Sequence, residues 1–251
     1  MNQDGWGELA KWYPESACDF QNLEHFLALI DSGLKTRKGR LQNALGTQHF
    51  VLSQQMSGIF LLAKSGIWLA IPPIVSSIFQ IAIEGIYLAN HPNRVNHFVE
   101  FSWYETHAEP KPIEADGLYA DIAKRIHEDR KSKFEKLRSG YQNKTSWHDH
   151  DVDSLAEAAG MGYLLPVYHS TSRLAQGSPI GFTSNGKGGR VWFDRHREKT
   201  TPVIAVGNAL IVVCHSTYHF YQAILSAFDV SNEMIIQAFE VFRSTLTRDH
   251  E

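Results

Sequence analysis

The chain has 251 residues, and its 24 lysines and arginines against 27 aspartates and glutamates give a net charge of −3 with neutral histidines. This balance excludes a protein that is basic over its whole surface and leaves only a local nucleic-acid patch open. The length is enough to bury a core without disulfides, and we expect Cys18 and Cys214 to stay reduced in a cytoplasmic protein. The first residues contain no apolar stretch, so we expect no cleaved secretory signal.

Apolar residues recur at helical steps of three and four along most of the chain, whereas strand-type alternation is scarce. We predict an all-α fold, a single helical bundle of about seven helices, with a long Gly-rich loop near residues 177–200. The expected parts are N-terminal helices in residues 1–44, a core in residues 45–228 and a C-terminal helix in residues 229–251. The last helix should begin near Ser231-Asn232.

The segment that starts at Lys64, KSGIWLAIPPIVSSIFQIAIEGIYLANHP, carries no charge before Glu84. Pro72 and Pro73 suit the first turn of a helix, where missing N–H groups cost nothing, and this helix should end near Ala89. Its apolar residues point to every side. The sequence therefore places this helix at the centre of a bundle or in a membrane.

A second segment of nearly membrane-spanning length, residues 202–228, has no formal charge but contains Asn208, His215, Ser216, His219 and Gln222. Two such segments keep a two-pass membrane protein open as an alternative, because about 20 apolar residues cross the hydrocarbon. The polar side chains inside the segments and the early proline pair favour two core helices without membrane contact.

Residues 117–140 are heavily charged and predict an exposed helix. Its few apolar side chains, among them Ile122, Ile126 and Leu137, should attach it to the rest of the protein. We expect its charged side chains to form a solvated outer face.

The run HDHDVD, which begins at His148, combines imidazole and carboxylate groups, the ligands that zinc and manganese take. Neighbouring residues in a loop rarely converge on one ion, however. Ser154 and Glu157 have the spacing of a capping box, and the acids before Ser154 favour a helix that starts there. We therefore expect no metal at this run, and nothing else in the sequence predicts a cofactor.

Two groups of short motifs lie in the middle of the chain. The first consists of Glu84-Gly-Ile-Tyr, an Asn-His-Pro stop, Arg94, Phe98 and Tyr104. The second consists of Trp147, Ser154-Leu-Ala-Glu and Tyr168-x-x-x-Ser172-x-x-x-Gln176-Gly-Ser-Pro. Together they resemble a bacterial family of unknown function, DUF5677, over roughly residues 45–228. The resemblance implies an all-helical intracellular protein without an established activity.

The chain departs from the family pattern at two positions. The pattern places an arginine one turn before the glutamate and a histidine four residues after the serine, where this chain has Gln80 and Gln176. Two members of a charged cluster that could act in relatives are therefore neutral here. The resemblance implies hydrogen bonding or ligand recognition rather than proton transfer.

Polar residues form three ladders at steps of four, which places the members of each ladder on one helix face. The ladders are Gln80 with Glu84, Tyr168 with Ser172 and Gln176, and His215 with His219. A buried carboxylate needs donors, so we expect these residues to converge in a buried polar cluster around Glu84. A structural network that fixes helix register is the favoured role, and a ligand or active site is the alternative.

The Gly-rich loop carries basic and aromatic side chains that suit an anion or a nucleic-acid strand: Lys187, Arg190, Trp192, Arg195 and Arg197. Two pairs have the arginine–histidine spacing of HEPN ribonucleases, Arg190 with His196 and Arg243 with His250. Twelve arginines and thirteen histidines give about two such pairs by chance. An HEPN-like RNA-directed nuclease or toxin is therefore an alternative that rests on fold analogy.

These observations predict a binding module that is non-enzymatic or degenerate in catalysis and contacts a protein or a small-molecule ligand. The resemblance implies a bacterial stress or defence setting. Nucleic acid through the basic loop and self-association stay open, and the nuclease and the two-pass membrane protein remain the alternatives.

Overall fold

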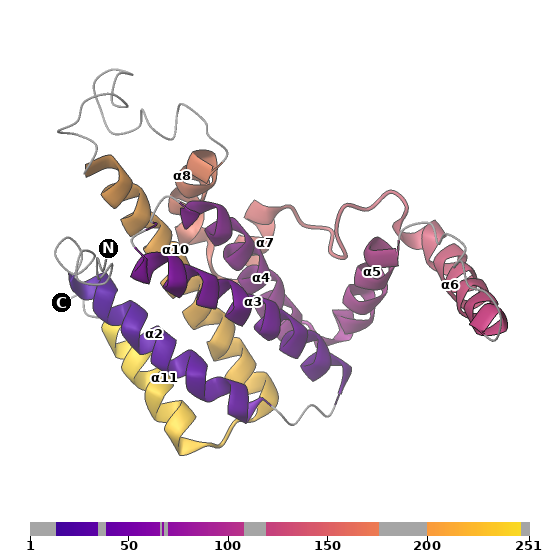
Figure 1. Cartoon of the computed structure of the whole chain (residues 1–251), viewed down its shortest axis with the longest axis horizontal. Coiled ribbons are helices and arrows are strands. Elements are labelled where there is room, and N and C mark those ends of the chain that lie inside the picture. The colour runs from indigo at the N-terminus through magenta and orange to yellow at the C-terminus, as the bar shows by residue number, and fades with distance from the viewer. Residues whose placement is uncertain are drawn as a thin grey trace. The chain divides into compact units, whose positions relative to one another are not determined.

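A computed structural model of the chain describes residues 14–34, 39–65, 67, 70–107, 119–175 and 200–246. Over these ranges the chain forms nine α-helices and two 3-10 helices without a strand, which confirms the predicted all-α class (Figure 1). The α-helices are α2 (Pro14–Gly33), α3 (Arg40–Lys64), α4 (Pro72–Asn90), α5 (Val95–His107), α6 (Ala120–Tyr141), α7 (Val152–Ala158), α8 (Leu165–Ala175), α10 (Thr200–Phe228) and α11 (Glu233–Leu246). The 3-10 helices are η2 (Pro92–Arg94) and η4 (Gly162–Leu164).

The helices belong to two compact units. The first contains the chain up to Asn90 and from Val152 onward, and the second contains His91–Asp151. The single-domain organisation stays a prediction. The predicted Gly-rich loop lies outside the described residues, apart from Thr200 at the start of α10.

Helix α4 is the centre of the first unit. It begins at Pro72, as the proline pair predicts, and packs against α10, α8, α3 and α7. Among the described helices, α4 alone is long and apolar enough to cross a membrane, and 56% of its apolar window is buried inside the protein. Core helices of soluble proteins pass the same test, so this finding is weak evidence for a membrane span and is compatible with a soluble protein.

Gly85 of α4 lies directly against the ring of Phe220 in α10. A Cβ atom at this position would lie 2.7 Å from Cδ2 of Phe220 and 3.1 Å from Oε1 of Gln48. The Phe220 side chain is fully buried, so its ring has little room to move aside. The packing of the two longest apolar segments therefore requires a residue without a side chain here.

Helix α3 is tied to its neighbours by polar pairs inside the core. Nδ1 of His49 and the hydroxyl of Tyr221 on α10 are 2.8 Å apart and buried. Nε2 of Gln55 donates to Oγ of Ser77 on α4 at 2.7 Å. Because a buried polar group without a partner is costly, these pairs favour one register of α3 against α4 and α10.

Helices α2 and α11 lie side by side along the outside of the first unit (Figure 1). Phe26 of α2 contacts Phe239 of α11 and Tyr221 of α10, with ring centroids 5.3 and 5.1 Å apart. Helix α11 begins after Asn232, whose Oδ1 accepts a hydrogen bond from the Met234 N–H at 3.0 Å. This N-cap explains the helix start that the sequence predicts.

The second unit is built on the pairing of α5 with α6. Tyr104 stacks on Phe134 at 5.0 Å, and Nζ of Lys133 lies 4.2 Å from the centre of the Trp103 ring. Ile122 and Ile126 of α6 are 53% and 41% exposed, so the prediction that they attach the helix is wrong. The residues of α6 that are buried instead are Ala123, Phe134 and Tyr141.

Replacing Gly85 with alanine tests the close approach of α4 to α10. The added methyl group overlaps Phe220, and we expect Gly85→Ala to lower the free energy of unfolding by about 1–2 kcal/mol despite its better helix propensity. Gly58→Ala in α3 is the matched control, because a Cβ atom there meets nothing within 4 Å. The control should gain about 0.5–1 kcal/mol. Urea denaturation measures both, and equal stabilisation by the two substitutions would contradict the packing.

Candidate functional site

The first predicted ladder lies on the least covered side of α4. Gln80 is exposed and Glu84 is half-buried, and Pro73, two turns before Gln80 on the same side, is exposed as well. The exposed position of Gln80 differs from the buried cluster that the sequence predicts. The physical reason is that α3, α8 and α10 cover the other sides of α4 and leave this stripe facing solvent.

The second ladder lies on α8, which packs against both α4 and α10. Tyr168 is buried, and its ring stacks on Phe79 of α4 with centroids 4.3 Å apart. Ser172 is half-buried, and Gln176 lies outside the described residues. Tyr168 therefore packs on α4 mainly through its aromatic ring.

The two histidines of the third ladder come together on one oxygen atom. The Tyr163 hydroxyl lies 3.0 Å from Nδ1 of His215 and 2.9 Å from Nε2 of His219. Both histidines are half-buried on α10, while Tyr163 is 54% exposed and belongs to η4. Tyr163 was not among the predicted site residues. We refer to these three side chains as the tyrosine–histidine cluster.

A helix C-cap places Tyr163 over α10. Gly160 has a φ of +74°, in the left-handed region where residues other than glycine are strained. The Gly160 N–H donates to the Glu157 carbonyl at 3.0 Å, and the Met161 N–H donates to the Ala156 carbonyl at 2.7 Å. This pair of hydrogen bonds is a Schellman motif, which ends α7 and turns the chain sharply into η4.

The number of protons in the tyrosine–histidine cluster limits which of its atoms can donate and which must accept hydrogen bonds. Burial raises the pKa of Tyr163 to about 12, and the negative charge that Tyr218 can carry adds to this. Although the side chain is half exposed, its hydroxyl lies against two imidazole rings. The neutral phenol has one proton, so with neutral imidazoles it donates to one histidine and accepts from the other. The two histidines therefore adopt complementary tautomers.

The capping box predicted at Ser154 is wrong. Helix α7 begins at Val152, so Ser154 lies inside it and Asp151 directly precedes the helix. Asp153 instead contacts His169 of α8, with 3.0 Å between Oδ1 and Nε2, and this contact is an ion pair when the imidazole is protonated. One carboxylate in the supposed capping region thus connects two helices.

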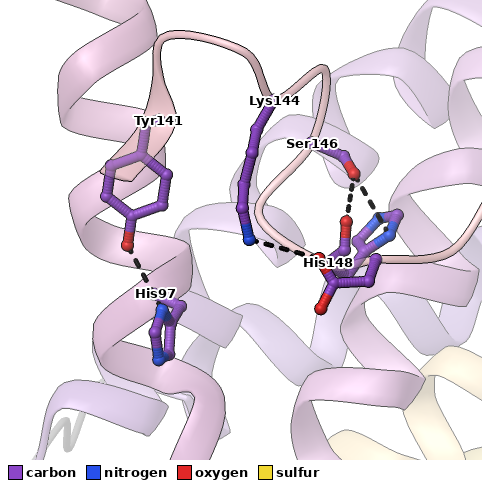
Figure 2. A network of polar contacts seen from close by, with 6 residues as sticks. His97, Tyr141, Lys144, Ser146 and His148 are labelled. Atoms are coloured by element: carbon purple, nitrogen blue, oxygen red, sulfur yellow. Dashed lines mark hydrogen bonds and ion pairs between the residues drawn. The ribbon is translucent and has the colours of Figure 1, made fainter. Parts of the chain in front are cut away.

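The second unit contains a polar network of its own, and Figure 2 shows its contact between Tyr141 and His97. The Tyr141 hydroxyl donates to Oε2 of Glu100 at 3.0 Å and lies 3.3 Å from Nδ1 of His97. Burial, together with the hydrogen bond to Glu100 and its charge, raises the pKa of Tyr141 to about 12. The network joins the end of α6 to α5, which is a structural task.

The HDHD run belongs to the loop that follows this network. Nζ of Lys144 donates to Oδ1 of Asp149 at 3.1 Å, and Ser146 donates to the carbonyl of His148 (Figure 2). Lys144, with smaller contributions from Arg94 and His150, lowers the pKa of the exposed Asp149 carboxyl. Within the described ranges, no group of three histidine, cysteine, aspartate or glutamate side chains is arranged to hold a metal ion.

A groove of about 360 Å³ runs between α2 and α3 in the first unit. Its walls combine apolar side chains with two serine hydroxyls, and the ion pair between Lys64 and Glu24 lies along it. The lining residues are Glu24, Leu27 and Ala28 of α2 and Ser53, Ser57, Phe60, Leu61 and Lys64 of α3. Sequence analysis missed this groove, because each helix alone shows only its apolar stripe.

Several predicted site residues lie outside the described part of the chain. These are the basic and aromatic residues of the Gly-rich loop, Lys187, Arg190, Trp192, Arg195 and Arg197, together with His196 and His250. Arg243 is described, and its guanidinium pairs with Glu240 at 3.1 Å. The anion or nucleic-acid patch and the HEPN alternative stay predictions.

The pKa of His219 gives a test of the tyrosine–histidine cluster. Burial lowers this pKa, although the Gln222 hydrogen bond opposes the shift. At this residue the unfolded chain therefore binds a proton at higher pH than the folded protein, and the contribution of His219 to folding stability falls as pH drops below about 6.5. We expect His219→Gln to flatten this dependence, measured as unfolding free energy between pH 7 and pH 5. An unchanged slope would contradict the burial of the imidazole.

The similarity of this chain to known proteins was tested at three levels. Comparison with models of protein families, with curated protein sequences and with solved structures finds no match for it. The geometry of the chain itself is therefore the basis for its functional interpretation.

Proposed function

We propose that the chain is a binding module that holds a small amphipathic molecule in the groove between α2 and α3. The observation that supports this proposal is the composition of the groove. Apolar side chains form much of both walls, while an ammonium group, a carboxylate and two hydroxyls provide polar contacts. Small-molecule sites combine mostly apolar walls with a few placed polar groups in this way.

The polar groups favour a ligand with hydrogen-bond acceptors at one end. Lys64 offers three N–H donors and uses one of them for Glu24, so the ammonium can still donate to a ligand. Both side chains of this pair are partly exposed, and exposed ion pairs contribute little to stability. A ligand can therefore replace this contact at a small energetic cost.

The apolar walls favour a flat or extended hydrocarbon body. Phe60 is nearly buried and forms a firm wall, while Leu61 is 67% exposed and gains by being covered. A volume of about 360 Å³ lies at the lower end of the range for small-molecule sites and is too small for a docked helix. The proposed occupant is thus a small molecule rather than a protein segment.

This proposal develops the binding module that the residues predict. The bacterial stress or defence setting comes from the family resemblance alone, and it is proposed on that basis. The ligand itself is defined here only by its chemistry, an apolar body with an acceptor-bearing end.

The fluorescent probe anilinonaphthalene sulfonate tests the groove, because it joins an apolar aromatic body to an anionic end. We expect one saturable site on the folded protein. Ala28→Trp should abolish binding, since Ala28 is an exposed lining residue and the indole would fill the groove. Lys64→Met should weaken binding by about tenfold, the effect of losing one charged hydrogen bond.

The matched control is His25→Trp, which adds the same indole to an exposed position of α2 outside the groove. It should bind the probe as the parent protein does. Equal binding by Ala28→Trp and the parent, in a folded variant, would place the probe elsewhere and reject the proposal. Loss of binding in both tryptophan variants would reject it as well.

A further inference from the structure

The tyrosine–histidine cluster has a feature that a purely structural contact does not need. Two imidazole nitrogens from successive turns of α10 lie within 3.0 Å of one phenol oxygen from η4. The three side chains are half-buried or exposed, so small solutes reach them from solvent. The cluster shares no residue with the α2–α3 groove, and its interpretation is independent of the proposed function.

We propose that Tyr163, His215 and His219 form a binding site for a divalent transition-metal cation of the zinc class. Histidines four residues apart on one helix face are a recurrent pair of zinc ligands. The structure adds Tyr163 from η4 to the two histidines of α10, so that three protein side chains are available as ligands. Water or an external ligand would take the remaining coordination position.

The observed distances are close to those of a metal site. Zinc lies about 2.0–2.1 Å from imidazole nitrogen, so two ligands of a tetrahedral ion are about 3.3 Å apart. The two oxygen–nitrogen separations, 3.0 and 2.9 Å, need to open by only a few tenths of an ångström. Small rotations of the side chains supply this change without moving α10.

The donor types decide which cation fits. Neutral imidazole nitrogens prefer zinc, copper, nickel and cobalt, whereas magnesium and calcium require mainly carboxylate, carbonyl and water oxygens. Two nitrogens and one phenol oxygen therefore select a transition metal. One imidazole already turns its lone pair toward the Tyr163 hydroxyl, whereas the other must change tautomer to present one. The phenol proton that lies between Tyr163 and the first imidazole is released to solvent when the cation binds, so cation binding releases a proton.

One histidine of the pair has a polar neighbour on its own helix. Gln222, one turn after His219, hydrogen-bonds to the His219 side chain. A hydrogen bond to the non-ligating side of an imidazole fixes its orientation and tautomer in known metal sites. In the proposed site, a hydrogen bond from Gln222 to the His219 nitrogen that faces away from Tyr163 would have this effect.

Other histidines in the chain provide a stringent control. Within the described part of the chain, His148 and His150 form a second close pair of histidines, with ring centroids 6.2 Å apart. They lie in the second unit, whereas Tyr163, His215 and His219 lie in the first. A general affinity of histidine-rich proteins for metals would act through both pairs, whereas the proposed site acts through His215 and His219 alone.

The test is a titration of the full chain, first stripped with a chelator, with Zn²⁺ followed by calorimetry. We expect one strong site per chain and a melting temperature that rises with Zn²⁺ concentration. His215→Ala/His219→Ala should raise the Kd by about 100-fold or more, and Tyr163→Phe by about tenfold. The control His148→Ala/His150→Ala should retain the parent Kd. Unchanged binding in the first variant, or weakened binding in the control, would overturn the proposal.

A second measurement needs no substitution and so does not depend on the folding of a variant. Diethyl pyrocarbonate modifies accessible histidines, and mass spectrometry locates the modified residues. Zn²⁺ at one equivalent should protect His215 and His219 and leave His148 and His150 reactive. Equal protection of the two pairs, or none at all, would overturn the site. Co²⁺ in place of Zn²⁺ should give the visible absorption of a nitrogen-ligated, low-coordinate ion, and a spectrum of hydrated Co²⁺ would contradict it.

Discussion

The contact between Gly85 of α4 and Phe220 of α10 determines how the rest of the first unit is arranged. Both helices are apolar over most of their surfaces, so their sequences leave open which side of each one faces the other. The missing side chain at Gly85 admits the Phe220 ring and fixes this choice. On α10 the same rotation buries Ser216 and Thr217 and turns His215 and His219 toward the opposite, half-exposed side. A packing contact in the core thus sets the position of the polar cluster at the surface.

Close packing at this contact has an energetic consequence for the polar groups around it. Oε1 of Gln48, which lies beside Gly85, and Oγ of Ser216 are buried and have no hydrogen-bond partner among the residues that the structure describes. A buried polar atom in that state costs about 1–3 kcal/mol. Other buried polar side chains, such as His49 and Tyr221, do form a hydrogen bond with each other. The core therefore keeps its tight helix contact at the expense of a few hydrogen bonds, and hydrophobic burial outweighs this loss.

Much of the fold follows from local sequence signals. Pro72 starts α4 and Asn232 caps α11, because both act through backbone geometry and hydrogen bonds within a few residues. The step of four residues likewise predicts that His215 and His219 share a face. The direction of that face is not local, since it depends on Phe220 meeting Gly85 from a distant helix. For this reason the same rule pairs Gln80 with Glu84 but does not reveal that Gln80 faces solvent.

The residues that sequence analysis missed lie where short elements meet long ones. Tyr163 reaches α10 only because Gly160 reverses the chain after α7, and the GMG turn before the tyrosine is the one signal of this in the sequence. The capping box is absent because α7 begins at Val152, two residues before Ser154. Asp153 is used by His169 of the next helix, a partner that no local pattern identifies.

The turn at η4 connects the short helices that pack on α4 to the long helix α10. Helices α7 and α8 pack on α4, and Tyr163 extends from the segment between them to α10. A side chain that links this segment to α10 restrains the turn and the core helix at the same point. An ion bound to Tyr163, His215 and His219 would strengthen that link, because coordinate bonds would replace two hydrogen bonds of modest net strength. The cluster lies on the exposed side of a helix whose opposite side is fixed by packing. Its donors are therefore held in place by a rigid element and remain open to solvent, the two conditions that a preorganised binding site requires.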